Sequence, residues 1–126
     1  MSKKVVSTTS APEAIGPYSQ AVAAADLVFC SGQIPLDPAT MELVSASVGE
    51  ETERCMRNLE AVLAEAGSGL ERILKTTIYV TNMDDFAQVN EAYGAFFPAE
   101  PPARATVGVA ALPKGARVEI ECVALR

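Results

Sequence analysis

Apolar residues recur along the chain with two different spacings, and each spacing predicts a different type of secondary structure. Runs that alternate, or that are β-branched and aromatic, predict strands over residues 4–9, 21–25, 27–31, 74–81, 104–109 and 117–125. In the run 74–81 we expect Leu74, Thr76, Ile78 and Val80 to share one face. Turn-forming residues separate these runs.

Two other segments have helical spacing. Ser47 to Glu50 has the form of a capping box, apolar residues recur at helical intervals over 48–66, and Gly67 is suited to the C-terminal cap. A second helix begins after Asn82, its expected N-cap, and Pro98 ends it. The order β-β-β-α-β-α-β-β predicts an α+β fold, a mixed sheet with two helices on one face, in a single domain over residues 1–126.

The last predicted strand is apolar on both faces. Val118, Ile120, Cys122 and Ala124 share one face, and Val123 and Leu125 share the other with Glu119 and Glu121. Two helices can cover only one face of a sheet, so the second face needs cover from another subunit. The pattern therefore predicts a homo-oligomer.

Composition narrows the possible partners. Apolar residues make up 49% of the 126 residues, enough for a real core, and the formal net charge is −6. A negative chain is not drawn to phosphate backbones or anionic lipids, so we expect no nucleic acid and no membrane partner. No apolar run approaches the length of a membrane helix, and the N-terminus lacks the apolar stretch of a secretory signal, which predicts a cytoplasmic protein.

Cysteine and histidine usage limits the chemistry. The three cysteines, Cys30, Cys55 and Cys122, have apolar neighbours and no C-x-x-C spacing, which indicates reduced, buried thiols. There is no histidine, so the usual metal ligand and the usual neutral-pH proton shuttle are both missing. We expect no metal and no cofactor, and chemistry that uses carboxylate, Arg, Tyr, Ser, Thr or backbone groups.

Arg104 is the candidate for binding an anion. It follows two prolines that stiffen its approach, and it shares a strand face with Thr106. Its planar guanidinium carries five N–H donors, and two of them can donate parallel hydrogen bonds to the two oxygens of a carboxylate. A surface salt bridge in an acidic protein explains the same residue and is the more common role.

Glu119 is the candidate for moving a proton. It stands with Glu121 on the half-apolar face of the last strand, where the pKa of a carboxyl group is raised toward neutral pH. Charges that protect an edge strand, or partners for Arg117 or Lys75, are the alternative interpretation, and the residues alone favour it somewhat.

Two turn segments and one asparagine complete the candidates. The segments 16–20 and 31–35 flank a hairpin, and there Tyr18 offers a flat wall while glycines let backbone N–H groups approach a ligand. Ordinary turn chemistry explains both segments equally well. Asn90 lies beside the apolar stripe of the second helix, where a part-buried amide must be hydrogen-bonded, so we expect it to pin a neighbouring loop; ligand contact is the alternative.

Taken together, these segments resemble the Rid family, RidA subgroup, also known as YjgF or L-PSP proteins. The resemblance is carried, in order along nearly the whole chain, by GPYSQ at 16–20, SGQIP at 31–35, the helix ending at Gly67, KTTIYV at 75–80, DFAQVN at 85–90, YGAFF at 93–97, PAR at 102–104, LPK at 112–114 and VEIE at 118–121.

This resemblance implies a chorismate-mutase-like fold and a homotrimer with three sites at the subunit interfaces. It implies hydrolysis of 2-enamines and 2-imines, such as 2-aminoacrylate, 2-iminopropanoate and 2-iminobutanoate, released by pyridoxal-phosphate-dependent serine and threonine dehydratases. The matching site positions are Tyr18, Ser31, Asn90, Arg104, Thr106 and Glu119, with backbone groups near Ser31, Gly32, Ala105 and Thr106. Many members carry Cys where this chain has Thr106.

In the implied mechanism, Arg104 and Glu119 are the catalytic pair. Arg104 holds the carboxylate of a small 2-imino or 2-oxo acid, Tyr18 packs over its carbon chain, and Glu119 activates water and returns the proton to nitrogen. A binding protein or holdase chaperone that uses the same cleft is the first alternative. A ribonuclease or translation inhibitor is less supported, because RNA binding needs a cationic track that this acidic chain lacks.

Overall fold

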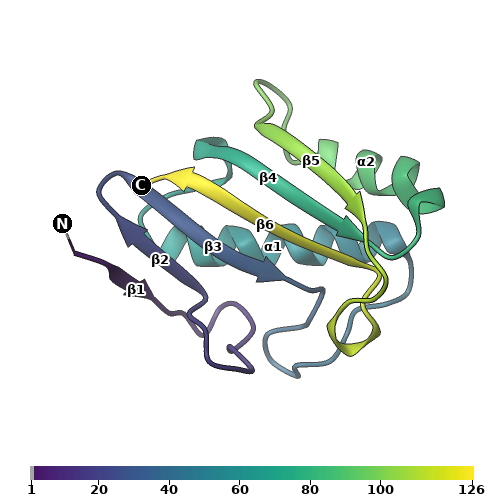
Figure 1. The fold of residues 1–126 in the computed structure, drawn as a ribbon, viewed down its shortest axis with the longest axis horizontal. Helices are drawn as coiled ribbons and strands as arrows, with labels where there is room; N and C mark the ends of the chain where they lie inside the picture. The colour runs from purple at the N-terminus through teal and green to yellow at the C-terminus, as the bar shows by residue number, and fades with distance from the viewer. Residues whose placement is uncertain (1) are drawn as a thin grey trace.

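The structure, a computed structural model, describes residues 2–126 as a six-stranded mixed sheet with two α-helices (Figure 1). The strands are β1 (Lys4–Val6), β2 (Ala21–Ala24), β3 (Leu27–Gln33), β4 (Ile73–Val80), β5 (Ala103–Gly108) and β6 (Val118–Leu125), and the helices are α1 (Val48–Glu65) and α2 (Phe86–Gly94). The sheet order is β1-β2-β3-β6-β4-β5, with β4 and β5 parallel and all other neighbours antiparallel. The predicted element order and α+β class are confirmed.

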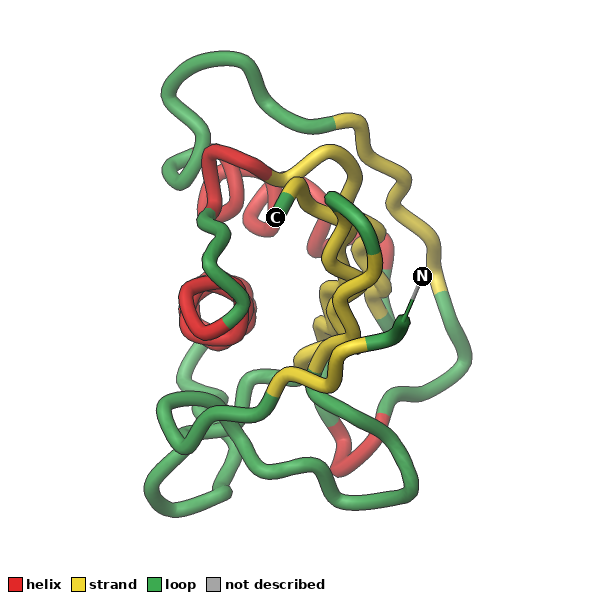
Figure 2. The backbone as a smooth tube through the Cα atoms, turned by 90° about the vertical axis from the view of Figure 1, so that its left-hand side faces the viewer, coloured by secondary structure: helices red, strands yellow, loops and turns green. Residues whose placement is uncertain are grey.

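Both α-helices lie on the same face of the sheet, which we call the helix face (Figure 2). The opposite face, the open face, carries no α-helix within residues 2–126. The predicted alternation along β6 is confirmed, since the residues buried under the helices are Val118, Ile120, Cys122 and Ala124. They pack with buried α1 side chains, among them Met56, Leu59 and Leu63, to form the core.

The open face carries an uncovered row of apolar side chains. Cross-strand register aligns Val5, Val22, Phe29 and Val123 on β1, β2, β3 and β6, and we call these four residues the apolar row. Val5 is 56% exposed and Phe29 is 48% exposed. An exposed row of apolar side chains is a common feature of contact surfaces. The predicted second apolar face is therefore present and is bare in a single chain.

Helix α1 begins and ends where the sequence predicts. The Ser47 side chain accepts a hydrogen bond from the Glu50 backbone N–H at 3.1 Å, and Gly67 has a φ of +80° just beyond the end of the helix. Glu51, in the first turn, is 1% exposed and pairs with Arg117, the residue directly before β6. This half-buried ion pair, which the pattern did not reveal, ties the helix to the start of β6.

The second predicted helix is shorter than expected. Asn82 caps as predicted, since its side chain accepts from the Asp84 backbone N–H at 2.9 Å. The segment Met83–Asp85 is a 3₁₀ helix, however, and α2 ends at Gly94, four residues before Pro98. The backbone beyond α2 tightens into bonds between residues three apart, which satisfies its last carbonyl groups without another α-helical turn.

The prediction that Leu74 shares one face of β4 with Thr76, Ile78 and Val80 is wrong. Ile73 pairs with Ala124 and Lys75 pairs with Val123, so one extra residue of β4 interrupts the ladder. A β-bulge of this kind shifts the alternation by one position. Ile73 consequently enters the core, and Leu74 is 44% exposed.

Candidate active site

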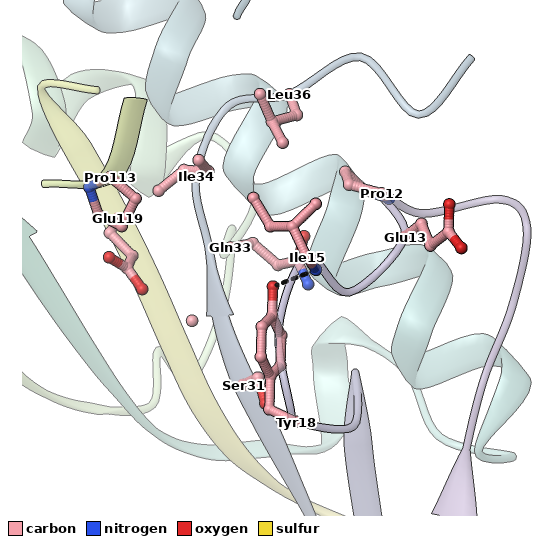
Figure 3. Close-up of a pocket in the computed structure, with 11 residues that line it drawn as sticks. Pro12, Glu13, Ile15, Tyr18, Ser31, Gln33, Ile34, Leu36, Pro113 and Glu119 are labelled. Carbon is pink, nitrogen blue, oxygen red and sulfur yellow. Dashed lines mark hydrogen bonds between the residues drawn. The ribbon is translucent and has the colours of Figure 1, made fainter. Parts of the chain in front are cut away.

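A cavity of about 430 Å³ opens between the loop before β2, the end of β3 and the start of β6 (Figure 3). Four predicted site residues line it: Tyr18, Ser31, Gly32 and Glu119. Apolar side chains, among them Ile15, Ile34 and Leu36, line the same cavity. A carboxylate, a phenol and a serine thus share one largely apolar enclosure, which is the usual construction of a small-molecule site.

Glu119 is the carboxylate that β6 directs into this cavity. Its neighbours Val118 and Ile120 are buried in the core, so alternation turns Glu119 to the open face. Partial burial raises the pKa of Glu119, and the negative charge of Glu121 raises it further. A carboxyl group with a raised pKa takes and returns a proton nearer neutral pH than an ordinary one.

Glu121 has a different partner. The Tyr79 hydroxyl on β4 donates a hydrogen bond to its carboxylate, and this bond is the main reason that the pKa of Tyr79 is raised to about 12. Strand β6 lies between β3 and β4, so the interpretation of Glu119 and Glu121 as charges that protect an edge strand is wrong. Arg117 pairs with Glu51 and serves neither of them.

Tyr18 and Ser31 stand on the opposite side of the cavity from Glu119 (Figure 3). The Tyr18 hydroxyl accepts a hydrogen bond from the Ile15 backbone N–H at 3.3 Å, which holds the ring along the cavity wall. The Ser31 hydroxyl donates to the Ser19 carbonyl at 2.6 Å. Because its proton is used in that bond, the Ser31 oxygen is left as an acceptor for a ligand N–H or a water.

Two buried amides that the sequence analysis missed anchor the cavity walls. Gln20 is 5% exposed, accepts from the Thr8 N–H at 2.7 Å and donates to the Pro12 carbonyl at 2.8 Å. Asn58 on α1 donates to the Leu36 carbonyl at 2.9 Å. Buried amides must find such partners, but only their burial reveals the need. In the sequence, Gln20 was visible only as the last residue of a turn segment.

Arg104 lies outside this cavity, on the helix face of the edge strand β5. Its guanidinium stacks 5.2 Å from the ring centre of Tyr93 and 5.6 Å from that of Phe86. The prediction that its side chain shares a face with Thr106 is consistent with the register, which aligns the two with Thr76 and Ile78 of β4. Within residues 2–126 Arg104 forms no salt bridge, so the salt-bridge interpretation is wrong. Its donors are therefore available to an anion.

Two buried oxygens near Arg104 lack partners. Asn90 Oδ1 and Thr106 Oγ1 accept or donate no hydrogen bond within the described residues. The interpretation that Asn90 pins a loop is therefore wrong for this oxygen. Asn90, Tyr93 and Arg104 line a second hollow, of about 380 Å³. An unsatisfied buried oxygen costs about 1–3 kcal/mol, so a donor that enters this hollow has a ready acceptor.

Backbone groups at the free edge of β5 differ between Ala105 and Thr106. The Val109 N–H donates to the Val80 carbonyl of β4 at 2.9 Å. Since backbone groups alternate in direction along a strand, the N–H of Ala105 points toward β4 and that of Thr106 points to the free edge. Thr106 is consequently better placed than Ala105 to donate to a ligand.

The two charged candidates are not brought together within one chain. Arg104 lies on the helix face and Glu119 lies on the open face. Strands β5 and β6 are separated by β4, and the register places Arg104 level with Cys122 rather than Glu119. Their α-carbons are therefore about 10 Å apart across the sheet and about 10 Å along it, from the usual strand spacings. The sheet itself stands between their side chains.

Among residues 2–126, no three His, Cys, Asp or Glu side chains gather closely enough to hold a metal ion. Cys30, Cys55 and Cys122 are free and buried, as predicted. In the same part of the chain, no helix has the length and apolar character needed to cross a membrane.

The fold and the cavity define a class of small α+β proteins, and comparisons with known proteins identify it. The family model described as Endoribonuclease L-PSP matches residues 8–126. The chain is 53% identical to Protein DfrA of Myxococcus xanthus, over 99% of this chain and 97% of that protein. It is 48% identical to mouse 2-iminobutanoate/2-iminopropanoate deaminase, over 98% of this chain and 92% of that protein.

A solved structure supports the same family. The conserved Rid family protein YyfA of Yersinia pestis superposes with a TM-score of 0.96 at 46% identity, over 99% of this chain and all of that chain. The chain therefore belongs to the L-PSP family, whose members are also called Rid proteins. Its fold is that of the family, as the resemblance implied.

Proposed function

We propose that this protein hydrolyses reactive 2-enamines and 2-imines of short 2-oxo acids to the 2-oxo acid and ammonia. The observation that carries this proposal is the pair of unlike groups: a cavity carboxylate with a raised pKa, and a guanidinium with no acidic partner in the described residues. The mouse relative, named for 2-iminobutanoate and 2-iminopropanoate, supports this substrate class.

Arg104 binds the substrate carboxylate in this proposal. Its planar fork donates two parallel hydrogen bonds, and the rings of Tyr93 and Phe86 beneath it limit its orientations. The outward N–H of Thr106 lies on the same strand edge and adds a backbone donor. Together they orient the imine carbon for attack, which is the principal contribution of a binding group to rate.

Glu119 activates the water. It takes a proton as the water oxygen bonds to the carbon of the protonated imine, and the C=N π electrons move to nitrogen. Glu119 then passes this proton to the nitrogen of the carbinolamine, and the C–N bond breaks as the hydroxyl proton returns to the carboxylate. Ammonia leaves and takes up that proton, so the products are the 2-oxo acid and ammonium. Tyr18 packs over the short carbon chain and Ser31 bounds the same cavity.

One substrate can meet both groups only if two chains build the site. We therefore propose a homotrimer, in which the open face of one subunit meets the β5 edge of the next. Such a head-to-tail contact closes into a ring of three where the rotation from one subunit to the next is a third of a turn. It also supplies cover for the apolar row, which lies bare in a single chain. In the cell, we place the protein in the cytoplasm beside pyridoxal-phosphate-dependent serine and threonine dehydratases, which generate such imines.

A coupled assay tests the proposed function. A serine or threonine dehydratase supplies the imine, and the appearance of the 2-oxo acid is followed with and without this protein. We expect the final hydrolysis to accelerate in proportion to the protein added. If 2-oxo acids bind but the rate stays that of free imine, the protein is a metabolite-binding protein and the proposal is wrong. Light scattering that reports a single-chain mass would overturn the trimer.

The family description names an endoribonuclease, and the same preparation can be tested for that activity. A formal net charge of −6 opposes association with a polyanion. Such binding depends on cationic side chains that neutralise phosphates and so release the counterions of the nucleic acid. We expect no cleavage of single-stranded RNA under conditions in which imine hydrolysis is fast.

A further inference from the structure

The wall of the cavity nearest Glu119 is made by an irregularity in β3. Cys30 pairs with Cys122 and Gln33 pairs with Ile120, so two residues of β3 stand opposite the single residue Glu121 of β6. This is a β-bulge, and it lets both Cys30 and Gln33 face the core although an odd number of positions separates them. Ser31 and Gly32, the two residues between these pairs, line the cavity.

Gly32 lies directly against the side chain of Glu119. A Cβ atom on Gly32 would lie 2.9 Å from Glu119 Cδ and 3.1 Å from Cγ, and closer still to a carboxylate oxygen. Real Cβ atoms essentially never lie within 3.0 Å of another heavy atom, so the flexible Glu119 side chain would have to move. Gly32 is not one of the glycines with positive φ, which are Gly67 and Gly115. Its backbone therefore accepts alanine, and the nearest obstacle to a side chain is Glu119.

The surroundings of Glu119 explain why this space matters. On the other side of β6, Tyr79 stands directly opposite Glu119 in the ladder, and its hydroxyl is bonded to Glu121. A carboxylate pushed away from Gly32 therefore moves toward an acidic neighbour and away from Tyr18 and Ser31. The missing side chain of Gly32 is what allows the carboxylate to lie over the β3 backbone inside the cavity.

We propose that Gly32 is a positioning residue for the reaction: the bulge at Ser31–Gly32 brings a residue without a side chain beneath Glu119 and so sets where its carboxylate meets water. This inference rests on the proposed function and adds a role to a residue otherwise expected only to present its backbone to the substrate. Displacement of a catalytic group by about 1 Å can cost about a hundredfold in rate.

The kinetic test uses Gly32→Ala in the full-length protein. We expect kcat to fall by about 10- to 100-fold while KM, and the Kd of a non-reacting 2-oxo acid, change by less than about threefold. In the Glu119→Gln background the same change should cost less than about twofold, because the group through which it acts is already removed. A rise in KM and Kd with kcat unchanged, or two losses that simply multiply, would overturn the proposal.

The matched control is Gly49→Ala, another glycine-to-alanine change in the first turn of α1 and outside both candidate halves of the site. A Cβ there meets only Ser47 Oγ, at 3.7 Å. Its kinetics should equal those of the unmodified protein. A loss comparable to that of Gly32→Ala would show that the assay reports a general sensitivity to glycine replacement, and would overturn the specific role.

A stability measurement decides the proposal even if Gly32→Ala folds poorly or the chain has no deaminase activity. Gly32→Ala should lower the Tm of the otherwise unmodified protein, because the new methyl group displaces Glu119. In the Glu119→Ala background, where that side chain is gone, the same change should leave Tm nearly unchanged. Equal losses in both backgrounds would show that Gly32 does not act through Glu119. An inactive protein with this stability pattern would refute only the proposed function.

Discussion

Glu119 and Arg104, the two charged residues of the candidate site, are supported in different ways on opposite faces of one sheet. Glu119 sits on a central strand inside a cavity, where partial burial raises its pKa. Arg104 sits on an edge strand, exposed, with its guanidinium over the rings of Tyr93 and Phe86. The Glu119 side chain is half-buried in a cavity, whereas the Arg104 side chain is exposed at the edge of the molecule.

This difference shows why a single chain is an incomplete catalyst under the proposed mechanism. Under this mechanism, Glu119 needs a carboxylate-binding group that its own chain does not bring to the cavity. Arg104 lies on an exposed edge strand, from which it can reach the cavity of a neighbouring subunit. The apolar row and Glu119 lie on the same face, so the surface that would hold a neighbouring subunit also carries the carboxylate of the cavity. Assembly and catalysis would thus depend on one face of the sheet.

The largest effect should come from the enclosed half. Glu119→Gln keeps the shape of the side chain but cannot accept a proton, so kcat should fall by about 10²- to 10⁴-fold, the usual contribution of a general base. Binding of a 2-oxo acid, measured by calorimetry, should be preserved, because the carboxylate ligand is held by Arg104. Loss of binding together with kcat would mean that Glu119 contributes to ground-state affinity instead.

Replacement of Arg104 should cause a smaller loss of activity, and one that also weakens binding. Arg104→Lys keeps the charge but loses the fork, and a hydrogen bond to a charged group contributes about 1.5–3 kcal/mol. At about 1.4 kcal/mol per factor of ten, kcat/KM should fall about 10- to 100-fold, and 2-oxo acid binding should weaken in parallel. Unchanged affinity in this variant would remove Arg104 from the proposed carboxylate site.

A mixing experiment tests whether the two halves come from different chains. When Glu119→Gln and Arg104→Lys subunits are unfolded together and refolded at equal amounts, about a quarter of interfaces should pair an intact Glu119 with an intact Arg104. Activity should therefore rise several-fold above that of either variant alone. If both groups acted within one chain, no mixture could restore an intact site and activity would stay at the mean of the two variants.

Glu121 offers a control that is close to Glu119 but outside its chemistry. Glu121 is about 6.5 Å along the strand from Glu119, so Glu121→Gln should retain activity within about twofold at neutral pH. Because the negative charge of Glu121 raises the pKa of Glu119, its removal lowers that pKa. Glu119 then stays deprotonated to lower pH, and the acid limb of the kcat/KM profile should move to lower pH. A shift in the opposite direction, or an inactive variant, would contradict the assignment of Glu119 as the base.

The smallest effect should come from Thr106. Its hydroxyl is buried without a partner in the described residues, and the proposed contact uses its backbone N–H. Thr106→Cys and Thr106→Ala should both keep most of the activity, since neither changes the backbone. Thr106→Val replaces an unsatisfied hydroxyl by a methyl group of similar shape and should leave Tm equal or slightly higher. An activity loss as large as that of Arg104→Lys would give the hydroxyl a chemical role.

Local pattern predicted the elements well and their irregularities poorly. The capping box at Ser47, the glycine cap at Gly67 and the alternation along β6 are each carried by residues close in the chain, and all three are confirmed. Leu74 was assigned to the wrong face because its strand contains a bulge that only pairing with β6 creates. The end of α2 at Gly94 likewise reflects the tightening of its last turn rather than the proline beyond it.

The sequence by itself determined the element order, the two periods of apolar residues, the acidic charge and the set of candidate side chains. Tertiary structure alone decided that Glu119 and Arg104 occupy opposite faces, that Gln20 and Asn58 anchor the cavity, and that Gly32 lies beneath Glu119. The physical reason is the separation along the chain of the residues that interact. Periodicity and capping depend on residues within one or two turns of each other, whereas strand register, bulges and the facing of a site depend on pairing between segments far apart in the chain.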